Sequence, residues 1–209
     1  MDLKNKYWVF QKAFSEKFCD DIIQHGNIQR ESTALIGGVP DIVNLNKKQI
    51  NNLQKTRNSN IAWLNDPWIY REVLPFIDAA NEIAGWNSDI DVSEDFQFTK
   101  YKLNQHYDWH CDSFPEPFNK PNIPLQNGKI RKLSATISLS DPSNYSGGEL
   151  EFNFNNPLKS KKENIKQCKE VLPRGSIVIF PSFVYHRVVP VTEGIRYSLV
   201  LWTLGNPYR

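Results

Sequence analysis

Two stretches in the front half of the chain combine helical periodicity with recognisable start and stop residues. Ser15 precedes an amphipathic run that closes at Gly26, which predicts a capped helix. Asp66–Pro67 supplies a cap residue and a favoured first helical residue, and the apolar spacing behind it continues to Gly85. The front of the chain is therefore expected to be rich in helix.

From residue 92 onward, short runs of alternating apolar residues replace the helical pattern. Turn signals such as Gly147–Gly148 separate these runs, and closely spaced strands of this kind are typical of a sandwich or a jelly-roll barrel. Together with two earlier runs, the predicted strands are Tyr7–Phe10, Ile61–Leu64, Phe96–Leu103, Lys132–Ser140, Gly148–Phe154, Gly175–Phe180, Val184–Val191 and Tyr197–Thr203.

These patterns predict a single domain over residues 1–209 that is mainly β with flanking helices. We expect residues 1–91 to form a helix-rich N-terminal support and residues 92–209 to form the β core, with the helices packed on one face. Two segments resemble insertions: Ser113–Gly128, which holds four prolines, and the lysine-rich Asn155–Lys169. The second is expected to be a solvated loop, and a lid that faces the substrate is the alternative.

Composition narrows the class of protein and its partners. The net charge is +2, so no strong electrostatic field steers the chain toward nucleic acid. No stretch approaches the roughly 20 apolar residues of a membrane span, and the first residues lack the apolar run of a signal peptide. Cys19, Cys111 and Cys168 are odd in number and widely spaced, which favours free thiols. We therefore expect a cytoplasmic protein, and its small size would fit a microbial or viral source.

Two histidines and one aspartate have the spacing of a metal site. His110 and Asp112 are two positions apart, and on a strand such side chains project to one face. His186 follows the apolar run Gly175–Phe180 and a turn, a rigid support that could return its ring to the same point. Two imidazoles and one carboxylate on one face of a metal are typical of non-haem Fe(II) oxygenases. Arg196 then fits the cation that would hold a dicarboxylate co-substrate.

Less specific explanations exist for each of these residues. His110 could be a half-buried, hydrogen-bonded histidine, His186 a surface histidine and Arg196 one half of a surface ion pair. A metal-binding isomerase or a cupin-like storage protein could also hold a metal, although such sites tend to use three or four histidines.

Further signals surround these positions in five segments that follow one another in order. They are Phe96–Asp112, Arg131–Ser140, Ser146–Phe152, Gly175–Val188 and Gly194–Trp202. Together they resemble the prolyl 4-hydroxylase-like branch of the Fe(II)/2-oxoglutarate dioxygenases, which includes the PKHD-type hydroxylases, over about half of the chain. The resemblance implies a double-stranded β-helix of the jelly-roll or cupin-like kind that binds Fe(II) and 2-oxoglutarate.

The resemblance also assigns roles to individual residues. His110, Asp112 and His186 would ligate iron, and Arg196 would pair with the distal carboxylate of 2-oxoglutarate. The other positions expected near 2-oxoglutarate are Tyr101, Ser138, Leu150, Val188 and Trp202. Asn104 stands where many relatives have glycine, and asparagine can also adopt the left-handed conformation.

A second group of residues is expected near the substrate. Arg57 resembles a position beside the substrate channel of some relatives. Tyr107, Trp109 and Tyr185 flank the proposed iron ligands, so they could line a substrate groove or simply pack the barrel.

The reaction that the resemblance implies is hydroxylation of a C–H bond coupled to oxidative decarboxylation of 2-oxoglutarate. Such a reaction uses O2 and releases succinate and CO2, with ascorbate as a candidate reductant. The resemblance favours a prolyl residue in a protein or peptide as the substrate. Another amino-acid side chain, a free amino acid or a modified nucleobase are alternatives, and so is a catalytically silent β-helix that binds a peptide or a sugar.

Overall fold

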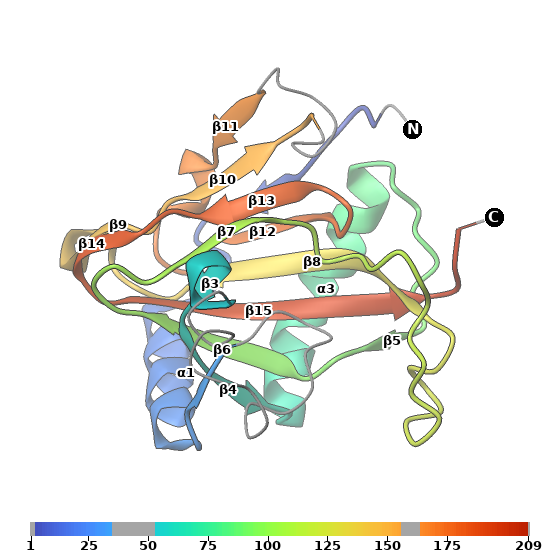
Figure 1. Ribbon diagram of the computed structural model, residues 1–209, viewed down its shortest axis with the longest axis horizontal. Coiled ribbons are helices and arrows are strands. Elements are labelled where there is room, and N and C mark those ends of the chain that lie inside the picture. The colour runs from blue at the N-terminus through green and yellow to red at the C-terminus, as the bar shows by residue number, and fades with distance from the viewer. Residues whose placement is uncertain (1–2, 35–52, 156–163, 209) are drawn as a thin grey trace.

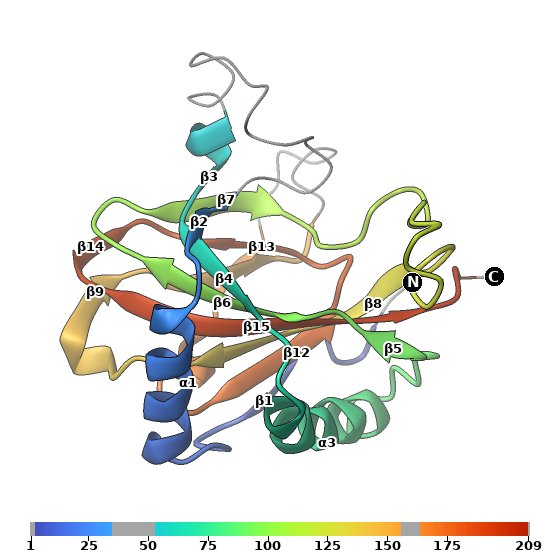
Figure 2. The ribbon, with the colours of Figure 1, turned by 90° about the horizontal axis from the view of Figure 1, so that it is seen from below.

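Two antiparallel sheets lie over one another, and two long helices cover the outer face of the larger sheet (Figures 1 and 2). The computed structural model describes residues 3–34, 53–155 and 164–208. The two long helices are α1 (Glu16–Ile28) and α3 (Pro67–Ile83), and two short 3-10 turns span Pro142–Asn144 and Lys169–Val171. The protein is therefore mainly β with helices on one face, as the sequence predicted.

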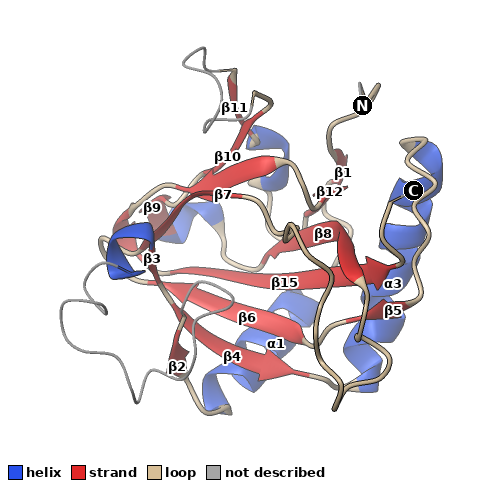
Figure 3. Cartoon of the chain, turned by 45° about the vertical axis from the view of Figure 1, so that its right-hand side comes forward, coloured by secondary structure: helices blue, strands red, loops and turns tan. Residues whose placement is uncertain are grey.

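The larger sheet runs through the middle of the molecule and the smaller one closes over it (Figure 3). In spatial order, the larger sheet contains β1 (Trp8–Phe10), β12 (Ile177–Pro181), β8 (Ile130–Ser138), β15 (Arg196–Gly205), β6 (Phe96–Tyr101), β4 (Asn60–Leu64) and β2 (Ser32–Thr33), with β5 (Val92–Ser93) beside β15. The smaller sheet contains β11 (Ile165–Gln167), β10 (Leu150–Asn153), β13 (Tyr185–Val188), β7 (His106–His110) and β3 (Arg57–Asn58). A separate ribbon pairs β9 (Tyr145–Gly147) with β14 (Val191–Gly194).

The central strands of the larger sheet have two different faces. Leu133 and Ile137 of β8 belong to an apolar cluster that includes residues of both helices. Ser134 and Thr136 alternate with them and therefore project toward the smaller sheet. The same alternation operates on β15, where Leu199 faces the helices. One face of the sheet thus builds the core, and the other is left for polar residues.

Helix α1 begins as predicted but does not end where the glycine suggested. The Ser15 side chain accepts a hydrogen bond from the backbone N–H of Phe18 at 3.1 Å, which caps the first turn. The helix continues through Gly26 to Ile28, so the prediction that Gly26 ends it is wrong. A methyl group on Gly26 would lie 2.4 Å from the Phe98 ring. This glycine therefore allows the helix to approach the sheet closely.

Helix α3 starts at Pro67, as predicted, and Asp66 occupies the cap position. The Asp66 side chain makes no capping hydrogen bond. It lies 2.7 Å from Nε2 of His25 instead, and this contact ties the start of α3 to the last turn of α1.

The predicted strands form, with bounds that move by a few residues. The run predicted over Val184–Val191 divides into β13 and β14, and the first 91 residues also supply β1, β3 and β4 to the two sheets. The division into an N-terminal support and a β core stays a prediction. Among the described residues, no helix has the length and apolar character that crossing a membrane requires.

The two segments that resembled insertions differ from each other. Ser113–Gly128 contains no helix or strand. Of Asn155–Lys169, residues 156–163 lie outside the described residues, so the loop and lid alternatives are not decided there. The loop prediction is wrong for Ile165–Gln167, which forms β11 against β10.

Gly26→Ala is expected to destabilise the fold even though alanine is the better helix former by about 1 kcal/mol. The added methyl group would overlap the Phe98 ring, and overpacking of this kind costs about 1–3 kcal/mol. Thermal or urea denaturation should show a net loss of stability. Asn27→Ala, at an exposed position of the same helix, is the control and should leave stability nearly unchanged. A stabilised Gly26→Ala protein would contradict the close approach.

Candidate active site

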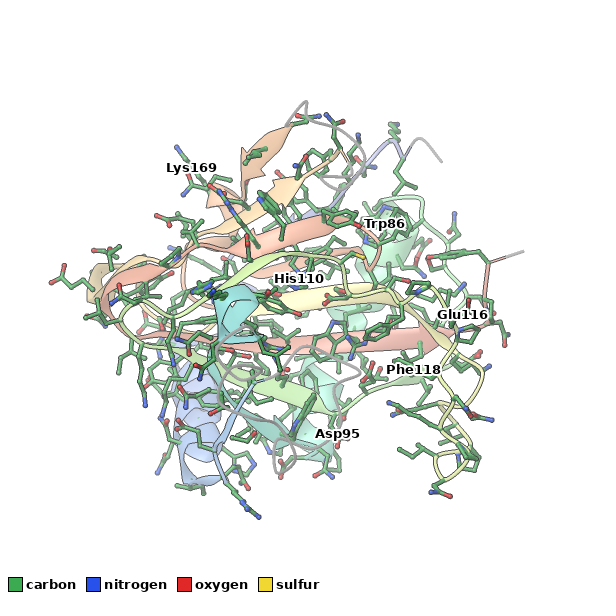
Figure 4. All side chains as sticks on the ribbon, in the orientation of Figure 1. Trp86, Asp95, His110, Glu116, Phe118 and Lys169 are labelled. Carbon is green, nitrogen blue, oxygen red and sulfur yellow. The ribbon has the colours of Figure 1, made fainter. Side chains whose placement is uncertain are left out.

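His110, Asp112 and His186 converge between the two sheets, and His110 lies near the middle of the face shown in Figure 4. The antiparallel pairing of β7 with β13 places His110 directly opposite His186, with ring centroids 4.1 Å apart. Oδ1 of Asp112 lies 3.7 Å from Nε2 of His110, and Oδ2 lies 3.6 Å from Nε2 of His186. The three potential ligand atoms all lie within 4.8 Å of one another. The three residues singled out in the sequence therefore form one cluster.

Backbone carbonyl groups fix the orientation of both imidazole rings. Nδ1 of His110 lies 2.7 Å from the carbonyl oxygen of Asp108, and Nδ1 of His186 lies 3.0 Å from that of Val184. A neutral histidine whose Nδ1–H donates to a carbonyl presents the lone pair of Nε2 on the opposite side. Both lone pairs then point toward Asp112, as a shared metal ion requires.

Asp112 is held by contacts beyond the end of its strand. β7 stops at His110, so the spacing within a strand does not by itself align the two side chains. The backbone N–H of Asp112 donates to the carbonyl oxygen of Ser182 at 2.8 Å. Ser134 Oγ donates to Oδ2 of Asp112 at 2.7 Å and lies 2.9 Å from Ser182 Oγ. Two neighbouring segments therefore position this carboxylate.

The protonation states of this cluster suit metal binding. Burial and the neighbouring His186 hold the pKa of His110 well below its ordinary value. Burial on its own would raise the pKa of Asp112, but electrostatic interactions with the neighbouring His186, His110 and Arg131 side chains outweigh burial and lower that pKa to about 2. At neutral pH, His110 is neutral and Asp112 is ionised, which are the forms that ligate a cation.

A β-bulge brings Tyr107 onto the same side as His110. His186 pairs with His110 but Val188 pairs with Tyr107, so β7 carries one more residue than β13 over this stretch. The Tyr107 ring stacks on the His110 ring, with centroids 3.4 Å apart and planes 10° apart. On its other side, the buried guanidinium of Arg57 lies 4.4 Å from the Tyr107 ring. Simple alternation would have placed Tyr107 and His110 on opposite faces.

An inner cavity connects the histidine–aspartate cluster to a buried arginine. Its lining includes the three candidate ligands together with Tyr101, Leu150, Val188, Arg196 and Trp202. Arg196 pairs with Tyr101 across β15 and β6, and its guanidinium lies 5.5 Å from the Tyr101 ring. Burial raises the pKa of Tyr101, so its hydroxyl remains a hydrogen-bond donor. A dicarboxylate in this cavity could reach a cation at one end and a metal at the other.

Gly148 makes room for the Arg196 side chain. Its φ angle is +67°, and a methyl group there would lie 2.8 Å from Cδ of Arg196. The Gly-Gly segment therefore has a steric role beside the cavity. Asn104 adopts the left-handed conformation with φ 62°.

The remaining predicted residues divide between the cavity and other surroundings. Arg57 and Tyr107 line it. Trp109 lies under the Arg187 guanidinium at 4.5 Å, and Tyr185 lines a separate pocket beside Phe154. The structure does not bring Trp109, Tyr185 or Ser138 into the lining of the cavity. Ser138 lies opposite Ser198 in the neighbouring strand.

Several lining residues were missed in the sequence. They are Gln97, Thr136, Ser198 and Val200. Gln97, Thr136 and Ser198 are polar residues on three different strands, and each alternates with apolar residues along its strand. That alternation is the signal that could have found them.

An outer cleft adjoins the inner cavity, and the residues common to both linings are Arg57, Gln97, Tyr107, His110, Asp112 and Trp202. The residues that it adds include Trp63, Glu94, Phe114, Lys120 and Arg131. Arg131 donates hydrogen bonds to both carboxylate oxygens of Glu94, at 2.5 and 3.0 Å, and its guanidinium lies 3.9 Å from the Trp202 ring. The indole N–H of Trp202 is buried beside the Asp112 carboxylate, and among the described residues it makes no hydrogen bond of good geometry.

Comparison with protein families decides the class of this chain. The family model of the 2OG-Fe(II) oxygenase superfamily matches residues 96–204, a little over half of the chain. The chain belongs to this superfamily. The matched segment spans β6 to β15 and holds the candidate ligands and Arg196.

Curated relatives of this 2OG-Fe(II) oxygenase include the PKHD-type hydroxylase YbiX of Escherichia coli strain K12 and its counterpart in Escherichia fergusonii. Each is 38% identical over 106 residues, which is 50% of this chain. The match covers 40% of the length of each relative. The similarity is therefore to the oxygenase segment of longer proteins.

Solved structures share the fold over nearly the whole chain. A Pseudomonas putida prolyl-4-hydroxylase has a TM-score of 0.63 at 16% identity and covers 98% of this chain and 95% of its own. The viral collagen prolyl hydroxylase of Paramecium Bursaria Chlorella virus-1 gives 0.58 at 19%, with 97% of each chain covered. A prolyl hydroxylase of Trichoplax adhaerens, solved with a hypoxia inducible factor peptide, gives 0.59 at 15%, with 96% and 84% covered. The fold is thus the double-stranded β-helix of these enzymes.

The residues present fit the metal and co-substrate of this superfamily. Two imidazoles and one carboxylate are a donor set for Fe(II). The buried Arg196, with Tyr101 beside it, is a fitting partner for one carboxylate of 2-oxoglutarate.

Gly148→Ala is expected to weaken 2-oxoglutarate binding because the new methyl group would displace the Arg196 side chain. We expect the dissociation constant, measured by calorimetry on metal-loaded protein, to rise by about tenfold, which corresponds to about 1.4 kcal/mol. Gly128→Ala is the matched control, because Gly128 has a similar φ angle of +74° but open space around it. Equal 2-oxoglutarate affinities in the two variants would show that the contact with Arg196 is unimportant.

Proposed function

We propose that this protein is an Fe(II)- and 2-oxoglutarate-dependent dioxygenase that hydroxylates a prolyl residue of a protein or peptide. The observation that carries the proposal is one cavity with the His110–Asp112–His186 cluster at one side and the buried Arg196 at another. The names of its curated relatives and structural neighbours support the same class of reaction.

The proposed roles follow from the positions of the side chains. His110, Asp112 and His186 would hold iron from one face and leave the other coordination positions open. The Arg196 guanidinium would hold the distal carboxylate of 2-oxoglutarate, and the Tyr101 hydroxyl would donate a hydrogen bond to it. When bound, iron and 2-oxoglutarate supply the oxidising chemistry, in which O2 is consumed and succinate and CO2 are released. Ascorbate is proposed as a reductant that keeps the iron in its ferrous form.

Apolar residues would separate this chemistry from bulk water. Leu150, Val188 and Trp202 line the inner cavity and are each largely buried. Excluding water strengthens the pairing of Arg196 with a carboxylate and protects reactive species. This is the expected contribution of the barrel interior.

The outer cleft supports a prolyl substrate. Trp63, Tyr107 and Trp202 supply aromatic surface along it, and a proline ring can pack against such surface without leaving a backbone N–H unsatisfied.

Turnover of 2-oxoglutarate tests the proposed function directly. Succinate would be followed by NMR in the presence of Fe(II), with and without a panel of proline-containing peptides, and the peptides would be weighed by mass spectrometry. Peptide-stimulated succinate together with an added oxygen atom would support prolyl hydroxylation. Succinate without any modified peptide would keep the oxygenase and reject the panel. Iron binding without succinate would instead favour a silent binding module.

Substitutions at the two ends of the cavity should have separable effects. His110→Ala removes a ligand and should abolish Fe(II) binding. Arg196→Ala should retain Fe(II) but raise the 2-oxoglutarate concentration needed for half-maximal turnover by about a hundredfold, because a buried charged pair is lost. Arg187→Ala is the control, since Arg187 pairs with Glu151 away from the cavity. Unchanged 2-oxoglutarate dependence in Arg196→Ala would refute the assigned role.

A further inference from the structure

The charges along the outer cleft are not balanced. Among the residues that the structure describes, three cationic side chains line it, those of Arg57, Lys120 and Arg131, against the carboxylates of Glu94 and Asp112. Both carboxylates are engaged: two hydrogen bonds from Arg131 hold Glu94, and Asp112 belongs to the candidate metal cluster. A divalent ion on that cluster would make the cleft more positive still. The cleft therefore favours a ligand that brings negative charge.

Lys120 is the cation of this cleft whose surroundings the structure defines most completely. Its Nζ donates to Oε1 of Gln126 at 2.8 Å and lies 4.1 Å from the centre of the Phe118 ring. Within the described part of the chain, no carboxylate lies within ion-pair distance of it. The ammonium group is thus oriented by neutral neighbours and keeps its capacity to pair with an anion.

Lys120 lies in the segment Ser113–Gly128, which forms one wall of the outer cleft and is held in place by hydrogen bonds between its own residues and Lys129. The backbone N–H of Phe118 donates to the carbonyl oxygen of Lys129 at 2.9 Å, and that of Gly128 donates back to Phe118 at 2.8 Å. The backbone N–H of Lys120 donates to Oδ1 of Asn127 at 2.9 Å. Phe118, labelled in Figure 4, belongs to this segment at the edge of the same face.

Aromatic contacts join this wall to the cleft. The Arg131 guanidinium lies 5.5 Å from the Phe114 ring and 5.9 Å from the Phe118 ring, and Arg131 is itself fixed by Glu94. A charge whose position is set before binding loses less conformational entropy when a partner arrives. Lys120 is therefore placed to discriminate between substrates rather than only to keep the protein soluble.

We propose that Lys120 is a specificity-determining residue that favours substrate segments with a carboxylate side chain close to the hydroxylated residue. The inference rests on the proposed function and adds to it the charge of the flanking sequence. An acidic side chain in the cleft gains from the cationic wall, and a basic one is repelled, which separates substrates by charge as well as by shape.

A series of nonapeptides with a central proline tests this proposal. The flanking positions would all be aspartate, all asparagine or all lysine, and each peptide would carry a fluorescent label so that binding to metal-loaded protein is read by anisotropy, independently of turnover. We expect the aspartate peptide to bind most tightly to the wild-type protein. Lys120→Gln should weaken its binding by about fivefold, the upper range for a partly exposed ion pair. Lys120→Glu should reverse the order of the aspartate and lysine peptides.

Lys17→Gln is the control, because Lys17 lies on α1 and pairs with Asp21 instead of facing the cleft. It should leave the order and the affinities unchanged. Equal binding of the three peptides to the wild-type protein, or an unchanged preference in Lys120→Glu, would overturn the proposal. If the peptides bind with the expected charge preference but are not hydroxylated, the role of Lys120 would stand. Only the proposed prolyl hydroxylation would then be rejected.

Discussion

The pairing of β13 with β7 is the constraint on which the rest of the site depends. This register places His186 opposite His110, and the bulge beside it turns Tyr107 to the same side. A shift by one residue would send each of these side chains to the opposite face of its strand. The facing histidines and the Tyr107 ring stacked on His110 are therefore consequences of a single strand alignment.

A buried carboxylate is costly unless its surroundings compensate for lost hydration. Asp112 receives one hydrogen bond from the Ser134 hydroxyl, and its own backbone N–H donates to the carbonyl oxygen of Ser182. Glu94 is compensated differently, by a two-point contact with Arg131. The two carboxylates thus have separate functions: Asp112 is directed at a cation site, and Glu94 fixes an arginine beside Trp202. Asp112 is therefore suited to binding a metal ion, and Glu94 to shaping the outer cleft.

Much of this arrangement could be predicted from the sequence, because it depends on local spacing. The ligand cluster, Arg196 and most strands follow from short motifs and alternation. Thr136 is marked by the alternation along its strand, but alternation alone does not show which face of the strand lines the cavity, so its contribution was missed. Gly26 was misinterpreted because a glycine near a helix end usually marks a stop, whereas here a ring on the sheet requires its small size. Trp109 and Tyr185 adjoin proposed ligands in sequence, but neighbouring residues of a strand project to opposite faces, so both side chains lie elsewhere.

Strands β8 and β15 pack against neighbours on both faces, so their residues tolerate substitution less well than residues of the surrounding loops. On these strands, apolar residues pack against the helices and alternate ones face the cavity, so a change on either side disturbs a closely packed neighbour. The proline-rich segment from Ser113 to Gly128 is not packed on two sides in this way. It contains no strand, and it contributes only to the lining of the outer cleft. A lineage could therefore exchange that wall and acquire new targets while its oxidative machinery stays the same.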